Sequence, residues 1–260
     1  MKKRNILWDV WGILYPLGIY YVLIMIVMYI AGFAVGQGEE TYVYRKLIGA
    51  VLTIPFLHQM FYVHDKTLNP GDYRKEPLKE RAIGVAFAVA AGVFLGFGLN
   101  NLISLTPLMN SSEYADAASA QYATNLWLEL GVFAVVTPLL EELLYRGIIF
   151  GRLRRLVKPW IAILISAAIF GAMHFNIVQL LYAGLIGIAL AYLMDRAGHM
   201  YIAVACHMTV NALSIVRTET GFLSQTLVQK PWAYLLAVTA CLVGVAILIA
   251  YGRRRGKEVA

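Results

Sequence analysis

The sequence predicts an all-α fold, a polytopic bundle of about eight transmembrane helices with both termini in the cytoplasm. Composition, long apolar runs and an uneven spread of basic residues support this prediction. Of 260 residues, 60% are hydrophobic and 14% are charged, whereas soluble domains carry about 25% charged residues. At about 20 residues per span, this apolar content allows roughly eight crossings. Collagen, coiled-coil, disordered and disulfide-rich classes are excluded.

The apolar runs give the expected spans in order. The first follows Lys2, Lys3 and Arg4, and it is too long for a signal-peptide core, so we expect it to be retained. The fifth has room for only about 15–17 helical residues, roughly 25 Å, so the hairpin 160–194 is expected to turn before the outer face. The approximate runs are 13–35, 47–63, 82–107, 126–150, 160–174, 177–194, 199–216 and 232–251.

The basic residues predict the orientation. With a cytoplasmic N-terminus, 17 of the 22 Lys and Arg residues fall on the inner face, which is the bias of cytoplasmic loops. We therefore interpret the net charge of +7 as a topology signal and expect no nucleic-acid partner. One membrane domain is expected over 1–260, without the internal repeats of many transporters. The outer basic residues are Arg45, Lys46, Arg217 and Lys230.

The fourth run contains charged residues where charge is costly. Glu142 and Arg146 are four residues apart, so they share one helix face and are expected to pair. Glu141 is rotated by about 100° and has Tyr145 at the next turn, so it lacks such a cation. An unpaired carboxylate in an apolar setting suits general acid–base chemistry. The alternative is a purely structural salt-bridge network, and Pro138 is expected to kink the helix nearby.

Two later runs add polar groups. His174 follows Phe170 by one helical turn, and Asn211 follows His207 in the same way. The amide of Asn211 could hold the His207 imidazole in one tautomer, or both could face one substrate oxygen. At a helical rise of about 1.5 Å per residue, these groups and Glu141 are expected at similar depths near the membrane midplane. The expected depth of His174 agrees least well with the others. The remaining histidines, His58, His64 and His199, are expected to be interfacial.

These groups suggest hydrolysis by an activated water with a stabilised oxyanion. Zinc held by Glu141, His174 and His207 is an alternative. The sequence has no H-E-x-x-H helix and no G-x-S-x-G elbow. Cys206 and Cys241 lie in apolar runs and are expected to behave as small hydrophobes.

The motifs E-E-x-x-x-R at 141–146, F-x-x-x-H at 170–174 and H-x-x-x-N at 207–211 resemble, in this order, the CPBP family. That family comprises type II CAAX prenyl endopeptidases and bacteriocin-processing or immunity-type membrane proteins. By motif the match covers about 126–216. The resemblance implies that Glu141 activates water with help from His174 and that no cofactor is required. Zinc remains the alternative cofactor. It assigns the oxyanion to His207 and Asn211, and support to Glu142 and Arg146.

The resemblance also implies a substrate class, namely a membrane-associated peptide or lipid-associated protein in a prokaryotic cytoplasmic membrane, with lipids as the surrounding partners. Two alternatives remain. One is a non-catalytic bacteriocin-immunity or scaffold protein, and the other is a proton-coupled transporter that uses buried Glu and His as relay groups. Hydrolysis is favoured because an imidazole and an amide suit an oxyanion better than a proton relay.

Overall fold

The computed structural model confirms the all-α class. It describes residues 6–68, 76–221, 230 and 232–259, and no strand occurs among them. Lys2, Lys3 and Arg4 lie outside the described residues, as does the side chain of His64. The elements are α1 (Ile6–Val35), η1 (Glu39–Thr41), α2 (Tyr42–Leu68), α3 (Leu78–Ser104), η2 (Pro107–Asn110), α4 (Ser112–Gln121), α5 (Leu126–Glu129), η3 (Leu130–Val136), α6 (Thr137–Glu142), η4 (Leu143–Phe150), α7 (Gly151–Leu156), α8 (Pro159–Ala172), α9 (Ile177–Ala197), α10 (Met200–Thr220) and α12 (Ala233–Val259).

Each of the eight apolar runs is helical. In the described residues, six helices are long and apolar enough to cross a membrane by length and composition, or seven if α4 and 126–156 form one bent span. Helix α8, with 14 residues, is shorter than a usual span. The expected count of eight spans is therefore not confirmed: among the described residues six helices qualify, or seven with the bent pair, and α8 is too short by this measure.

The helix from α5 to α7 carries the acidic motif. It runs without interruption through two π-helical segments, η3 and η4, which lie on either side of α6. Pro138 stands in the first turn of α6 and has no N–H to donate, so the wider turns before it accommodate the missing bond. Such π-helical turns are frequent at functional sites, because they change the direction of side chains within a helix.

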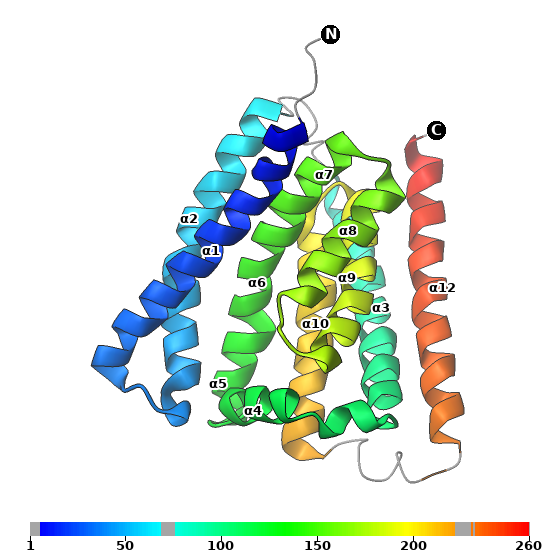
Figure 1. Ribbon diagram of the computed structural model, residues 1–260. Coiled ribbons are helices and arrows are strands. Elements are labelled where there is room, and N and C mark those ends of the chain that lie inside the picture. Colours follow the sequence, from blue (N-terminus) through cyan, green and yellow to red (C-terminus); the bar gives the residue numbers. More distant parts are fainter. Residues whose placement is uncertain (1–5, 69–75, 222–229, 231, 260) are drawn as a thin grey trace.

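Helices α8 and α9 form the expected short hairpin. Helix α8 begins with Pro159 after Lys158, and α9 begins at the N-cap Asn176, whose side chain accepts a bond from the Gln179 amide at 2.8 Å. The turn between them stops short of the lower end of the bundle (Figure 1). The hairpin is therefore placed to carry His174 into the interior.

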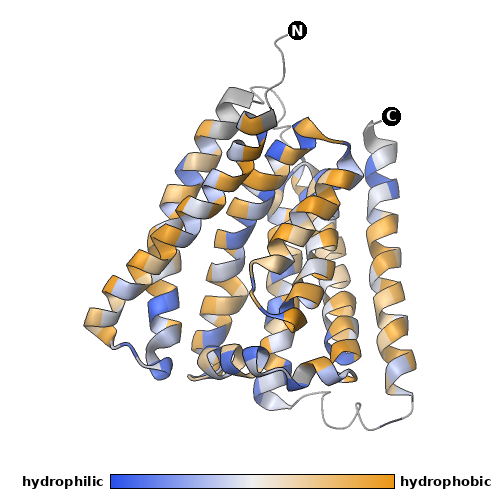
Figure 2. Ribbon diagram, viewed as in Figure 1, coloured by the Kyte–Doolittle hydropathy of each residue, from blue (hydrophilic) through white to orange (hydrophobic). Residues whose placement is uncertain are grey.

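The helices leave both ends of the chain on one side. The start of α1 and the end of α12 lie at the same end of the bundle, and α4 lies across the opposite end (Figure 1). This placement is what an even number of crossings requires. Hydrophobic colour covers most helix surfaces, and hydrophilic residues interrupt the long central helix in its middle part (Figure 2).

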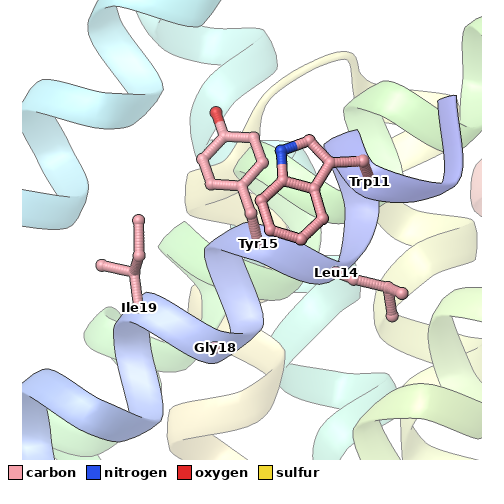
Figure 3. Close-up of a pocket in the computed structure, with 5 residues that line it drawn as sticks. All are labelled: Trp11, Leu14, Tyr15, Gly18 and Ile19. Atoms are coloured by element: carbon pink, nitrogen blue, oxygen red, sulfur yellow. The ribbon is translucent and has the colours of Figure 1, made fainter. Parts of the chain in front are cut away.

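Aromatic and basic side chains join the N-terminal part of α1 to α7. Trp11 and Tyr15 lie side by side on α1 and line a small apolar pocket (Figure 3). The guanidinium of Arg152 stacks over the Tyr15 ring at 4.8 Å and donates to its hydroxyl at 2.7 Å. Arg152 also donates to the carbonyl of Gly12. Trp, Tyr and Arg in this arrangement are typical of a membrane interface.

Candidate active site

Four of the predicted residues line one cavity. The cavity has a volume of about 610 Å³ and lies inside the bundle, where Glu141, His174, His207 and Asn211 all contribute to its wall. The expected convergence of three separate runs is therefore confirmed. Further polar lining residues come from α1, α2, α3, α4, η4, α9 and α10: Tyr20, Tyr21, Lys46, Asn100, Ser104, Tyr114, Tyr145, Gln179, Tyr182, Ser214 and Arg217.

The imidazole of His207 lies between two carboxylates. Its Nδ1 is 2.8 Å from Oε1 of Glu142, and its Nε2 is 3.7 Å from Oε2 of Glu141. A carboxylate accepts, so the short contact places a proton on Nδ1. The tautomer of His207 is thus set by Glu142, rather than by Asn211 as one sequence alternative had it.

Arg146 completes this buried network. Its Nη1 donates to Oε1 of Glu142 at 2.8 Å, and both side chains are fully buried. Its Nη2 donates to the carbonyl of Gly187 at 3.3 Å, and its guanidinium lies 4.5 Å from the centre of the Phe170 ring. The predicted pairing is confirmed. The phenyl ring also makes edge contacts with His174 and His207, at 5.1 and 5.5 Å between centroids, so it packs against all three groups.

The two adjacent glutamates have different surroundings. The side chain of Glu142 has no exposed surface and accepts from both Arg146 and His207. The side chain of Glu141 retains 14% exposure and faces the cavity. A helical step of about 100° per residue accounts for this difference. Glu141 is therefore the carboxylate that a molecule in the cavity can reach.

His174 reaches the cavity from the turn after α8. Its Nδ1 lies 2.9 Å from the carbonyl oxygen of Phe170. A carbonyl only accepts, so Nδ1 carries the proton and Nε2 is left for a ligand. Phe175, the next residue, has φ of 58°, a left-handed conformation that turns the chain sharply into α9.

Asn211 is only partly available. Its Nδ2 donates to the carbonyl of Phe133 in η3 at 2.9 Å, which leaves one amide hydrogen and the side-chain oxygen for other partners. The bond also links α10 to the π-helical segment before the acidic motif. Asn211 therefore both positions a helix and faces the cavity.

The proposed zinc ligands do not form a metal site. Among the described residues, no group of three or more His, Cys, Asp or Glu side chains is arranged to hold a metal ion. His207 turns Nδ1 to Glu142, and His174 turns Nδ1 to a backbone carbonyl, so each imidazole keeps Nε2 for another partner. Glu141, His174 and His207 are the residues that would hold zinc in that alternative.

Several cavity residues were not found from the sequence. The Tyr21 hydroxyl donates to the Met173 carbonyl at 3.2 Å and lies 3.1 Å from the Tyr145 hydroxyl. The signal for Tyr145 was its position one turn after Glu141. Lys46 and Arg217 were interpreted only as outer topology markers, but both line the cavity. His199 is the N-cap of α10, near a helix end as expected, whereas His58 is exposed within α2, well before its end at Leu68.

The fold and the site define a class: a helical integral membrane protein with a Glu–His–Arg network beside an internal cavity. Residues 123–213 match the family described as Type II CAAX prenyl endopeptidase Rce1-like. This segment holds every predicted site residue. The match to this family of membrane proteases agrees with the resemblance indicated by the motifs.

One curated relative supports the same conclusion. The protein named "Putative membrane peptidase YdiL" of Bacillus subtilis (strain 168) is 33% identical over 85 residues, which is 33% of this chain. The aligned segment spans 35% of that protein, so the likeness covers about a third of each chain. No solved structure matches the chain significantly.

Proposed function

We propose that the protein is an intramembrane endopeptidase that hydrolyses a peptide bond of a membrane-associated peptide or protein. The observation that carries this proposal is the contrast within the acidic pair. Glu141 faces the cavity beside His207 and His174, while Glu142 is enclosed by Arg146 and His207. One carboxylate is free for chemistry and its neighbour holds the imidazole in place. The match of this segment to a protease family agrees with the proposal.

In the proposed reaction, Glu141 takes a proton from a water molecule in the cavity. The water oxygen attacks the carbonyl carbon, and the carbonyl oxygen becomes an oxyanion. The carbon–nitrogen bond then breaks, and the leaving nitrogen receives the proton that Glu141 had taken. His174 assists through Nε2, which its bond to the Phe170 carbonyl leaves directed to a ligand. No charge or atom remains unaccounted for.

The oxyanion is proposed to bind to Nε2 of His207 and to the spare amide hydrogen of Asn211. Because Nδ1 of His207 already donates to Glu142, Nε2 can donate only when the ring carries a second proton. The proposed oxyanion site therefore uses the doubly protonated ring, which Glu142 holds in place. Glu142 and Arg146 are therefore positioning residues, since they act through His207. This preorganised donor pair is of the kind that stabilises acyl-transfer oxyanions.

The test compares purified wild type with Glu141→Gln and His174→Ala on a peptide library in detergent micelles. Loss of a general base lowers rates by about 10²- to 10⁴-fold, so we expect Glu141→Gln to lower kcat by this amount with little change in KM. Glu113→Gln is the matched control, because Glu113 is an exposed carboxylate on α4. Since no cofactor is proposed, wild-type activity should also survive exhaustive chelation.

Other outcomes point elsewhere. Equal cleavage by wild type and Glu141→Gln would contradict this mechanism. Absence of cleavage, together with immunity retained in Glu141→Gln, would indicate the non-catalytic immunity or scaffold role. Proton-coupled uptake that requires Glu141 would indicate transport. Recovery of a chelated enzyme by zinc would contradict the metal-independent proposal.

A further inference from the structure

A second polar region lies at the α4 end of the cavity, away from the acidic motif. We call it the outer polar cluster and define it by six residues of α3, α9 and α10. Its members face one another across three helices, and five of them, including the cation Arg217, line the cavity. They are Asn100, Asn101, Ser104, Tyr182, Ser214 and Arg217.

The neutral members of the outer polar cluster already have partners. Asn100 donates to the Tyr182 hydroxyl at 2.8 Å and to the backbone of its own helix. Ser104 donates to the Asn100 carbonyl at 2.7 Å, and Ser214 lies 3.4 Å from the Asn100 side-chain oxygen. These bonds fix the positions of the side chains around Arg217.

Arg217 is the exception in this cluster. Its Nη2 donates to Ser104 at 3.0 Å and to Asn101 at 3.4 Å, both neutral acceptors. Its Nε is buried and has no hydrogen-bond partner. In the part of the chain that the structure describes, no carboxylate forms an ion pair with it. A guanidinium has five donors and prefers a bidentate carboxylate, so this one retains capacity for an anion from outside the chain.

The spacing along α10 relates Arg217 to the proposed active site. His207 and Arg217 are ten residues apart on one continuous helix, which corresponds to about 15 Å along its axis. An extended peptide advances about 3.3 Å per residue. A peptide whose reacting carbonyl lies at His207 would therefore reach Arg217 with its fourth or fifth residue.

We propose that Arg217 is the anchor of a carboxylate-binding subsite and sets substrate specificity. The subsite takes a carboxylate of the peptide about four or five residues from the bond that is cleaved. The carboxylate is either the C-terminus of the chain or an Asp or Glu side chain. This inference rests on the proposed peptidase function for its substrate, but the binding chemistry belongs to Arg217 itself.

The experiment measures binding rather than cleavage, in the Glu141→Gln background. The probes are fluorescent apolar peptides made with a free C-terminal carboxylate, with a C-terminal amide, or with the amide and a Glu or Gln scanned along the chain. A hydrogen bond to a charged group makes a difference of about 10- to 100-fold, so we expect the carboxylate peptides to bind more tightly by this factor. Tighter binding of the free C-terminal carboxylate indicates that the subsite takes a C-terminus. Tighter binding of an amidated peptide with Glu rather than Gln indicates that it takes an acidic side chain.

Substitution of Arg217 should remove this preference. We expect Arg217→Gln to bind acid and amide peptides alike and Arg217→Lys to keep part of the preference. Arg45→Gln is the matched control, because Arg45 donates hydrogen bonds to Gln37 and Gly38 and is not among the described residues that line the cavity. An undiminished preference in Arg217→Gln would overturn the proposal. Equal binding of acid and amide peptides by protein that retains Arg217 would also overturn it. This second measurement decides the case even if Arg217→Gln does not fold.

Failure of the proposed function gives a different result. If wild type cleaves no peptide but the Glu141→Gln protein still prefers carboxylates through Arg217, the subsite stands and the peptidase assignment falls. If wild type cleaves acid and amide peptides at equal kcat/KM, the peptidase assignment stands and the subsite falls.

Discussion

At the scale of single residues, the orientation of His207 depends on one contact between helices. The Nδ1 of His207 reaches Glu142 at 2.8 Å, and the same oxygen accepts from Arg146. Both donors are therefore directed at one buried oxygen of Glu142. This arrangement aims Nε2 of His207 toward Glu141 and the cavity. Glu142 and Arg146 thus determine which nitrogen of the His207 imidazole a substrate meets.

The burial of this pair leads to a stability prediction. Arg146→Met removes one partner and leaves Glu142 as an uncompensated buried charge, which costs about 3–5 kcal/mol of unfolding free energy. The double variant Glu142→Gln with Arg146→Met removes both charges, so it should lose less than the sum of the single variants. Thermal unfolding in detergent, followed by circular dichroism, provides the measurement. Strictly additive losses would mean that the two side chains are not energetically coupled.

Residues within one helix were predictable from the sequence, whereas contacts between helices were not. A spacing of four residues was enough to pair Glu142 with Arg146. The bond from Asn211 to the Phe133 carbonyl depends on how α10 faces η3, which no local spacing reveals. Lys46 and Arg217 look like loop charges in the sequence, because the helices that enclose them come from distant segments.

At the scale of elements, the short α8–α9 hairpin brings His174 inside the bundle. Close packing keeps the two helices together. A Cβ on Gly171 would lie 2.5 Å from the Leu180 carbonyl oxygen and 3.0 Å from the Gly184 Cα. Only a glycine permits this approach, and His174 follows three residues later. The packing of the hairpin and the position of the imidazole are therefore linked.

Gly171→Ala should accordingly impair both stability and the site. The added methyl group meets backbone atoms that cannot rotate away, and overpacking of this kind costs about 1–3 kcal/mol. We expect a lower unfolding temperature and reduced kcat through displacement of His174. Gly18→Ala is the matched control on α1, because a Cβ there has nothing within 4 Å. An unfolding temperature for Gly171→Ala equal to that of Gly18→Ala would refute the packing argument.

The positions of the helices were predictable from the sequence, but their lengths and internal geometry were only partly predictable. The expected short run 160–174 corresponds to α8 and its turn, since length and flanking Pro and Asn residues are visible in the sequence. The π-helical segments around α6 are not visible, because wide turns depend on tertiary contacts that local propensity does not encode. Pro138 suggested a kink, and the structure has π-helical turns there instead.

At the scale of the whole molecule, the orientation in the membrane determines which compartment the cavity faces. The positive-inside bias predicts cytoplasmic termini, and both described ends of the chain lie opposite α4 (Figure 1). Residues of α4 line the cavity. If the charge bias holds, the α4 end of the cavity is therefore on the extracytoplasmic side.

Cysteine labelling in intact cells tests this orientation. We expect Asp116→Cys, an exposed position on α4, to react with a membrane-impermeant maleimide. We expect Gly256→Cys, exposed near the end of α12, to react only after the cells are opened. The unaltered protein controls for Cys206 and Cys241, which are buried and half-buried. The reverse labelling pattern would place α4 in the cytoplasm, and the outer polar cluster would then receive substrates from that side, because Arg217 and α4 line the same cavity.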